Sequence, residues 1–201
     1  MTEGRGGFLR DNFFLVAAVS LPLLVVLFFV AATAIPRWTV APPQYDLVLR
    51  ADGYYDQAAV RLSVDYAVRD GSIEATFRPL PQPTYISPAR LFLFDHATMN
   101  VRPIAVDIPT DMKEGDAPRT ITVEALTGHR VTADSAAPDG YQLDNRSRRG
   151  PGLVGDLFGM NRYDSSAALV KSGRIVPITL PQPNQYGGAV YLVGWITDGA
   201  R

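Results

Sequence analysis

The feature that most constrains this chain is an apolar segment without a single charge, Phe13–Ile35, close to the N-terminus. Its 23 residues would form an α-helix about 35 Å long. A hydrocarbon core is about 30 Å thick, so the segment is long enough to cross a lipid bilayer with some tilt. The sequence therefore predicts one transmembrane helix over residues 13–35, with the bilayer as its first partner.

Pro22 lies in the middle of this predicted helix, two residues after Ser20. A proline inside a helix frees the carbonyl four residues earlier, which a serine, a neighbouring helix or a local adjustment must satisfy. The result is either a tolerated kink or a surface shaped for a partner helix, and the sequence leaves both open. Pro22 is thus a candidate contact with subunits of an integral membrane complex.

The charges that flank the segment predict its orientation. The tail formed by residues 1–12 carries Arg5 and Arg10, whereas Arg37 is the one basic residue close behind the segment. The positive-inside bias favours a cytoplasmic tail and an exported C-terminal domain. Trp38 suits the outer interface, where indole rings lie among headgroups, so Arg37 and Trp38 are candidate membrane contacts.

A cleaved signal peptide is the alternative, because Ala32-Thr33-Ala34 fits a small-x-small cleavage site. The apolar run is longer than the core of a signal peptide, at about 7–15 residues, and matches a membrane-spanning helix instead. Both interpretations export the rest of the chain. Retention predicts a single-pass protein of the bacterial inner membrane with its C-terminal domain on the periplasmic side.

Composition excludes several kinds of site. The 201 residues include no cysteine, which excludes a disulfide framework, thiolate metal sites and a cysteine nucleophile. A net charge of −1 argues against a nucleic-acid partner, because nucleic-acid-binding surfaces carry a clear basic excess. The preference for arginine over lysine favours a GC-rich bacterial source.

Beyond the apolar segment, the sequence pattern indicates β-strands. Pro42-Pro43 stiffens a short connector over residues 36–44, and residues 45–201 are expected to form one domain. Between Val60 and Val68, apolar and polar residues alternate with a period of two, which is typical of a strand. Further strands are expected over 73–78, 90–94, 101–108, 120–125, 130–133, 168–170, 174–179 and 189–197. Many short strands predict an all-β fold, an antiparallel β-sandwich or partly open barrel, after one N-terminal transmembrane helix.

The sequence Leu-Pro-Gln-Pro occurs twice, over residues 80–83 and 180–183. Both copies are expected to be turns between strands. Proline has no N–H to donate to the hydrogen bonds of a central strand, so it marks a rim or an edge of a sheet. The repeat is either the trace of duplicated half-domains or a coincidence in a proline-rich chain.

His96 and Met99 form a His-x-x-Met pair after the strand expected over 90–94. Histidine and methionine ligands suit copper(I), which makes the pair a candidate for metal delivery. Only one further histidine, His129, exists to complete a site. A loop histidine beside a gap-filling methionine is the simpler interpretation, so no metal and no cofactor is assigned.

Residues 134–152 are predicted to form a long polar loop that leads into an apolar stretch. Such a loop is often functional, and a basic cluster beside apolar residues suits anionic headgroups or a partner protein. The alternative is that the apolar residues join the core and the arginines are solvated. The G-x-G-x-x-G match over 150–155 lacks a βαβ setting and is not a dinucleotide site. The candidate contacts here are Arg146, Arg148, Arg149, Leu153, Val154, Leu157 and Phe158.

Catalytic motifs do not stand out. The sequence has no G-x-S-x-G elbow, no recognisable triad and no H-E-x-x-H or calcium-loop motif. We therefore expect a non-enzymatic, membrane-anchored accessory or scaffolding subunit of a larger membrane complex, respiratory or photosynthetic, that acts by protein–protein contact. The alternatives are a metal-delivery or assembly factor and an envelope hydrolase. One span followed by a β domain resembles accessory proteins of respiratory oxidase assembly, although architecture alone does not transfer function.

Overall fold

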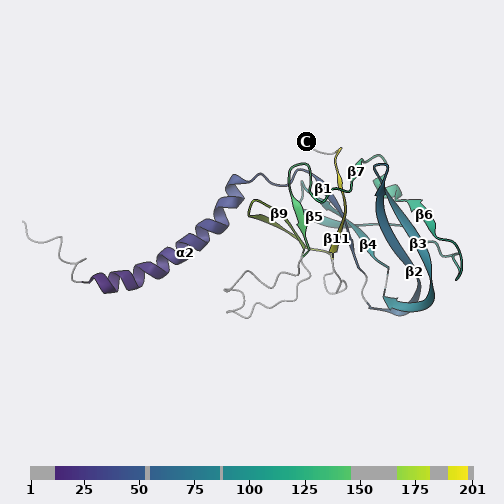
Figure 1. Ribbon diagram of the computed structural model, residues 1–201, viewed down its shortest axis with the longest axis horizontal. Coiled ribbons are helices and arrows are strands. Elements are labelled where there is room, and N and C mark those ends of the chain that lie inside the picture. The colour runs from purple at the N-terminus through teal and green to yellow at the C-terminus, as the bar shows by residue number, and fades with distance from the viewer. Residues whose placement is uncertain (1–11, 53–54, 87, 146–166, 182–189, 199–201) are drawn as a thin grey trace, which may run out of the picture. The chain divides into compact units, whose positions relative to one another are not determined.

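The computed structural model describes residues 12–52, 55–86, 88–145, 167–181 and 190–198. Within these residues the chain forms one long α-helix and three antiparallel sheets, none of which closes into a barrel (Figure 1). The chain divides into a helical unit, residues 1–41 with 172–174, and a β unit, residues 42–171 with 175–201. A mostly β fold after one apolar helix confirms the coarser part of the predicted fold class.

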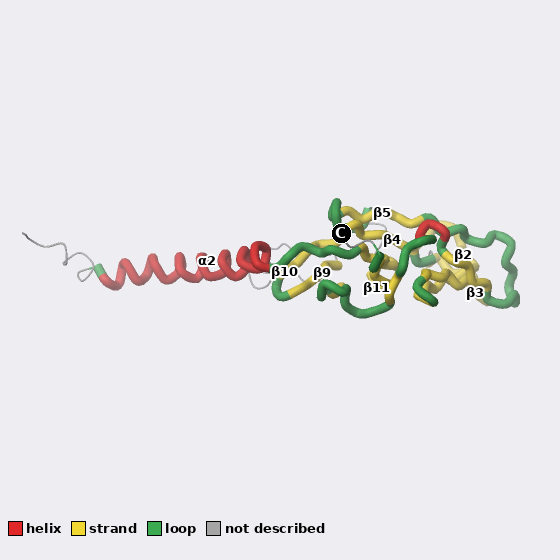
Figure 2. Tube along the Cα trace, turned by 90° about the horizontal axis from the view of Figure 1, so that it is seen from above, coloured by secondary structure: helices red, strands yellow, loops and turns green. Residues whose placement is uncertain are grey.

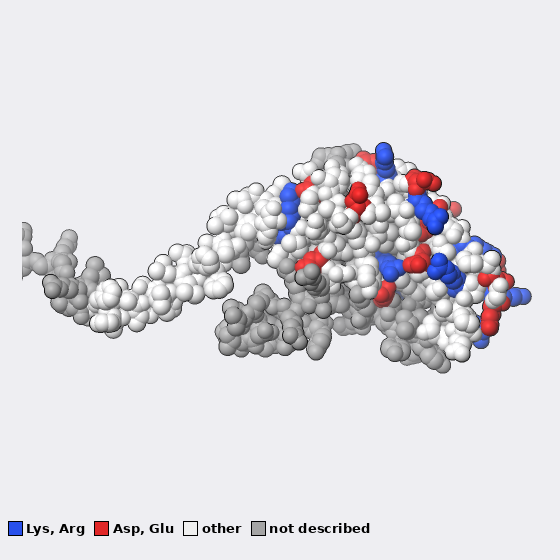
Figure 3. Space-filling view, viewed as in Figure 1, with Lys and Arg blue, Asp and Glu red and all other residues white. Residues whose placement is uncertain are grey.

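Helix α2, Phe13–Thr39, follows directly from the apolar segment. Within Phe13–Pro36, the most apolar window of 18 residues has a mean hydropathy of 2.9, and no part of that window is buried. By length and composition this helix could cross a membrane. Figure 3 shows an uncharged surface along most of it, whereas basic and acidic side chains are interspersed over the β unit.

The helix continues past Pro36, where the sequence predicted a connector. Its last turn is completed by the Val40 amide, which donates to the Pro36 carbonyl at 3.1 Å. The Thr39 hydroxyl also donates to the carbonyl four residues earlier, at 3.0 Å. Val40 is extended, with φ −98° and ψ 125°, and ends the helix. Arg37 and Trp38 therefore lie in the last helical turn, where Trp38 is 85% exposed.

The largest sheet has five strands in the order β5-β4-β1-β11-β7. Its middle strand was not among the strands expected individually from the sequence, because Leu47-Val48-Leu49 is a continuous apolar run. β1 pairs antiparallel with both neighbours, and Leu47 lies opposite Phe94 on one side and Trp195 on the other. The strands are β1 (Asp46–Ala51), β4 (Arg90–Asp95), β5 (Asn100–Ile104), β7 (Val131–Thr132) and β11 (Val190–Ile196).

Strands β2 (Tyr55–Arg69) and β3 (Ser72–Ile86) form a long hairpin, and β6 (Arg119–Thr122) pairs with β3 to complete a second sheet. A short 3-10 helix, Glu124–Leu126, follows β6. The hairpin turns at Asp70-Gly71, where φ is 49° and 78°, the positive values that two-residue hairpin turns favour. The alternation predicted for β2 is confirmed: Val64, Tyr66 and Val68 pack against a core, whereas the residues between them are exposed.

The first Leu-Pro-Gln-Pro copy lies inside β3, so its predicted position in a turn is wrong. β6 pairs with Glu74–Phe77 of β3, and among the described strands none continues that side of the ladder beyond Phe77. The prolines thus occupy an edge, where a missing amide donor is tolerated. On the other side, the register with β2 shifts between Val60 and Leu62. The second copy follows β10 (Arg174–Ile178), and its last two residues lie outside the described residues.

The third sheet has the order β10-β9-β8, with β8 at Gln142–Asp144 and β9 at Ala167–Lys171. Ahead of β8, the Ala137 amide donates to the Tyr141 carbonyl at 2.8 Å, and the Tyr141 side chain is fully buried. The prediction of a loop over residues 134–152 is therefore wrong for the first half of this segment. That half folds back onto the core because Tyr141 anchors it.

The five-stranded sheet is buried on both faces. In β4, Phe92 and Phe94 belong to one apolar cluster, whereas Leu91 and Leu93 belong to another. Residues of β9 and β10 complete the first cluster and residues of β3 complete the second. Figures 1 and 2 both show this sheet between the β9–β10 hairpin and the β2–β3 hairpin. A strand covered on both faces is apolar throughout, which explains the unbroken run in β1.

Candidate functional site

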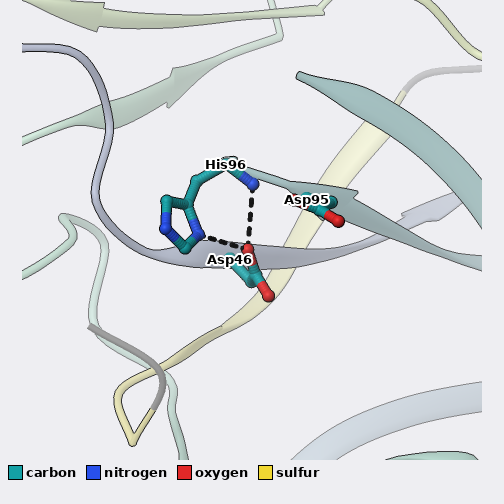
Figure 4. Close-up of side chains that lie close together, drawn as sticks. All are labelled: Asp46, Asp95 and His96. Atoms are coloured by element: carbon teal, nitrogen blue, oxygen red, sulfur yellow. Dashed lines mark hydrogen bonds and ion pairs between the residues drawn. The ribbon is translucent and has the colours of Figure 1, made fainter. Parts of the chain in front are cut away.

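One rim of the five-stranded sheet brings two carboxylates and an imidazole together. β1 begins at Asp46 and β4 ends at Asp95, and because these strands are antiparallel neighbours, both residues lie at the same rim. His96 is the first residue of the turn after β4. Figure 4 shows the His96 ring beside the Asp46 carboxylate.

Asp46 holds His96 by two contacts. Its Oδ1 atom accepts a hydrogen bond from the His96 backbone amide at 2.9 Å and lies 2.6 Å from Nδ1 of the ring. The two side chains are half-buried, with exposed fractions of 22% for His96 and 26% for Asp46. A carboxylate at Nδ1 fixes the orientation of the imidazole ring.

Asp95 organises the turn that carries His96. Its Oδ1 atom accepts hydrogen bonds from the backbone amides of Ala97, at 2.8 Å, and Thr98, at 3.1 Å. The Thr98 amide is the main cause that holds the pKa of Asp95 below its ordinary value of 3.8, and the Ala97 amide adds to it, although partial burial opposes both. Asp95 is therefore a carboxylate at neutral pH.

The three residues offer one nitrogen and two oxygen ligands. One such atom from each of Asp46, Asp95 and His96 lies within 4.8 Å of the others. Imidazole with carboxylate oxygens suits a borderline divalent cation such as Zn²⁺, whereas copper(I) prefers sulfur ligands. A divalent metal therefore suits this cluster of three residues better than it suits the predicted His-x-x-Met pair.

Met99, the other half of that pair, closes the four-residue turn between β4 and β5. Asp95 and Asn100 face each other across this hairpin, and Met99 has a left-handed φ of 56° with 40% of its side chain exposed. Sequence reasoning found His96 but missed Asp46, which lies 50 residues away. No local pattern connects the two, because only the pairing of β1 with β4 makes them neighbours.

The second histidine also lies beside a carboxylate. His129 Nδ1 is 3.4 Å from Asp198 Oδ1, and the second oxygen of Asp198 accepts the Arg130 backbone amide at 3.0 Å. Half of the His129 side chain is exposed. This longer, more exposed contact is the natural comparison for the Asp46–His96 pair.

A hollow of about 670 Å³ lies between the end of β1 and the β2–β3 hairpin. Among its lining residues, Asp65 lies 2.8 Å from the Arg50 guanidinium and 3.9 Å from that of Arg78. Arg50 also lies over the Tyr191 ring, 4.9 Å from its centroid. The Asp65 carboxylate is thus engaged by arginines, which is unfavourable for the general acid or base of a hydrolase.

No protein-family model, curated protein or solved structure matches this chain. Of the contacts predicted from the sequence, Pro22, Arg37 and Trp38 lie in α2. The others lie outside the described residues: Arg146, Arg148, Arg149, Leu153, Val154, Leu157 and Phe158.

Proposed function

We propose that this protein is a membrane-anchored accessory or scaffolding subunit of a larger membrane complex and acts by protein–protein contact. The observation that carries the proposal is the apolar helix α2, whose most apolar window is 0% buried. A helix that is apolar on all sides requires a lipid or protein environment, and the described residues do not provide one.

The β unit supports this interpretation because its core is assembled from its own residues. Both apolar clusters consist of residues between Tyr45 and Ile196. The span is therefore available for lipid and for partner subunits. In the proposed arrangement the β unit is a sandwich-like domain on the periplasmic side of a bacterial inner membrane, and the host is an energy-transducing complex, respiratory or photosynthetic.

Purification of the full chain from native membranes in a mild detergent tests the proposal. We expect the protein to migrate on a native gel with the same integral membrane subunits in repeated preparations. Extraction with carbonate should leave it in the membrane fraction, as for a spanning helix. A protein that migrates alone, or that carbonate releases, would contradict the proposal.

A second candidate function is metal delivery or assembly of a metal enzyme, favoured by the donor set of Asp46, Asp95 and His96. Titration of the full chain with Zn²⁺, and separately with copper(I) under anaerobic conditions, tests it. We expect Zn²⁺ binding that His96→Ala abolishes and His129→Ala preserves. Equal binding by the two variants, or no binding by the wild type, argues against this function.

A further inference from the structure

The turn between β9 and β10 is attached to the C-terminal end of α2. Ser172 and Gly173 form this turn with φ values of 44° and 82°, the positive values that two-residue hairpin turns favour. An N–H of the Arg174 guanidinium donates to the Val40 carbonyl at 2.6 Å. A Cβ atom at Gly173 would lie 3.3 Å from Pro36 Cγ, so the turn lies against the prolyl ring. The turn and the helix accordingly belong to one compact unit, although 134 residues separate Arg174 from Val40.

This attachment determines how deep the turn lies once α2 crosses a membrane. The uncharged segment ends at Ile35, so Pro36 lies at the edge of the hydrocarbon core. Val40 is about 6 Å further along the helix axis, and the headgroups form a layer of about 5–8 Å on each side of the core. A turn that contacts both Pro36 and Val40 therefore lies at the level of the headgroups. Trp38, which is 85% exposed, suits the same level.

The side chains around the turn suit a surface rich in phosphate. Lys171 precedes the turn, and its ammonium lies 5.5 Å from the centroid of the Tyr141 ring, which keeps the charge beside the turn. The sequence between Ala167 and Pro181 contains no acidic residue. On the other side of the turn, Ile175 is 42% exposed and offers an apolar side chain to the boundary between headgroups and acyl chains.

The carboxylate of Asp139 lies close to this region but is directed to backbone donors. It follows from its neighbour Gly140, where a Cβ atom would lie 3.8 Å from Lys171 Cε. The two oxygens of Asp139 accept the amides of Gln44, at 2.8 Å, and Tyr141, at 3.2 Å. Within the described part of the chain Lys171 forms no ion pair, so its charge can serve an anionic partner.

We propose that the β9–β10 turn, residues 171–175, binds the anionic headgroups of the bilayer that α2 spans. Lys171 contacts lipid phosphate, Ile175 enters the boundary with the acyl chains, and Arg174 positions the turn through the Val40 carbonyl. The inference rests on one part of the proposed function, that α2 crosses a membrane. It adds a lipid-binding site outside the spanning helix.

Single spin labels on the full chain in lipid nanodiscs test the depth of the turn. The chain has no cysteine, so Ser172→Cys labels the turn alone. Val25→Cys labels the span, and Ala105→Cys labels an exposed position after β5, at the end of the five-stranded sheet opposite Asp46. Accessibility to oxygen and to a nickel complex reports the depth of each label. In nanodiscs with phosphatidylglycerol we expect the Ser172 label among the phosphates, the Val25 label in hydrocarbon and the Ala105 label in water.

A change of lipid tests the chemistry of the contact. Replacing phosphatidylglycerol by phosphatidylcholine removes the net negative charge of the surface. We expect the ratio of immobile to mobile label at Ser172 to fall about fivefold, the factor for one lysine near an anionic surface. Lys171→Gln should abolish this dependence on lipid. Lys113→Gln, at the exposed second lysine of the chain, should preserve it.

Loss of the arginine contact tests how the turn is positioned. Arg174→Ala removes the donor to the Val40 carbonyl, and we expect the Ser172 label to become more accessible to the nickel complex. Arg102→Ala, at an exposed position in β5, is the control and should leave the label among the phosphates. Unchanged fluorescence of buried Trp195 shows that the fold is retained in both variants.

Three results overturn the inference: a Ser172 label as accessible to the nickel complex as the Ala105 label, no dependence on the lipid, or equal responses of the two lysine variants. When the Val25 label still lies in hydrocarbon, these results leave the proposed function standing. A Val25 label in water rejects the span, and with it the inference and the proposed function together. The lipid contact requires the span alone, so absence of partner subunits on a native gel rejects the proposed function while a Ser172 label among the phosphates still supports the inference.

Discussion

The Nδ1 atom of His96 lies 2.6 Å from Oδ1 of Asp46, although 50 residues separate them. The same oxygen accepts the His96 backbone amide, so one carboxylate joins the start of the central strand to the turn after its neighbour. This contact lies in the β unit and is accessible to measurement whatever the function of the span.

The first prediction concerns the stability of this rim. Asp46→Ala removes the acceptor of both contacts, and we expect a loss of about 1–2 kcal/mol in the free energy of unfolding, as for a half-buried charged acceptor. Urea unfolding of the full chain in detergent, followed by the fluorescence of buried Trp195, measures the loss. Asp107→Ala, at an exposed position, is the control and should change little. Equal effects would show that Asp46 contributes no more than a surface aspartate.

The second prediction concerns acid stability. The Thr98 and Ala97 amides hold the pKa of Asp95 below 3.8, its value in an unfolded chain. The carboxylate therefore stabilises the fold above that pH, and its contribution is lost as the pH falls through the lowered pKa. Asp95→Asn should be less stable than wild type at neutral pH, and the difference should shrink below about pH 4. Urea unfolding at a series of pH values measures it, and a difference that is constant with pH contradicts this account.

The third prediction concerns close packing between β11 and β7. A Cβ atom at Gly194 would lie 2.5 Å from Val131 Cγ1 and 2.7 Å from the Thr132 carbonyl oxygen. Gly194→Ala must therefore push the strands apart, and we expect a loss of about 1–3 kcal/mol. Gly115→Ala is the comparison, because its site is open but has a positive φ of 88°. Thermal unfolding by circular dichroism should show the larger loss at Gly194.

The fourth prediction separates two arginines that share one carboxylate. Arg50 lies 2.8 Å from Asp65 and over the Tyr191 ring, whereas the Arg78 contact with Asp65 is 3.9 Å long and exposed. We expect Arg50→Ala to cost about 1 kcal/mol and Arg78→Ala less than about 0.5 kcal/mol. Raising the salt concentration should reduce the Arg50 effect only in part, because the ring contact remains. The opposite order of the two variants would reject this assignment.

Local sequence patterns predicted part of this fold well. The uncharged run predicted α2, and the period of two in β2 predicted a strand that ends at the Asp70-Gly71 turn. Both signals depend on residues close together in the chain, whose spacing is fixed by helix and strand geometry.

The features of the fold that were not predicted correctly share a different cause. β1 was not expected as an individual strand, because both of its faces are covered and this removes the alternation that marks a half-buried strand. Residues 80–83 were expected in a turn because a proline disrupts a ladder, yet β6 ends its pairing at Phe77 and leaves them at an edge. In each case the deciding fact is which strand lies alongside.

The sequence by itself determined that this chain has a helix apolar and long enough for a membrane, with a proline inside it, because these properties follow from covalent structure and local spacing. Only the tertiary structure decided that Asp46 meets His96. That contact depends on the register between β1 and β4, which is fixed by side chains packing on two faces of one sheet across many intervening residues.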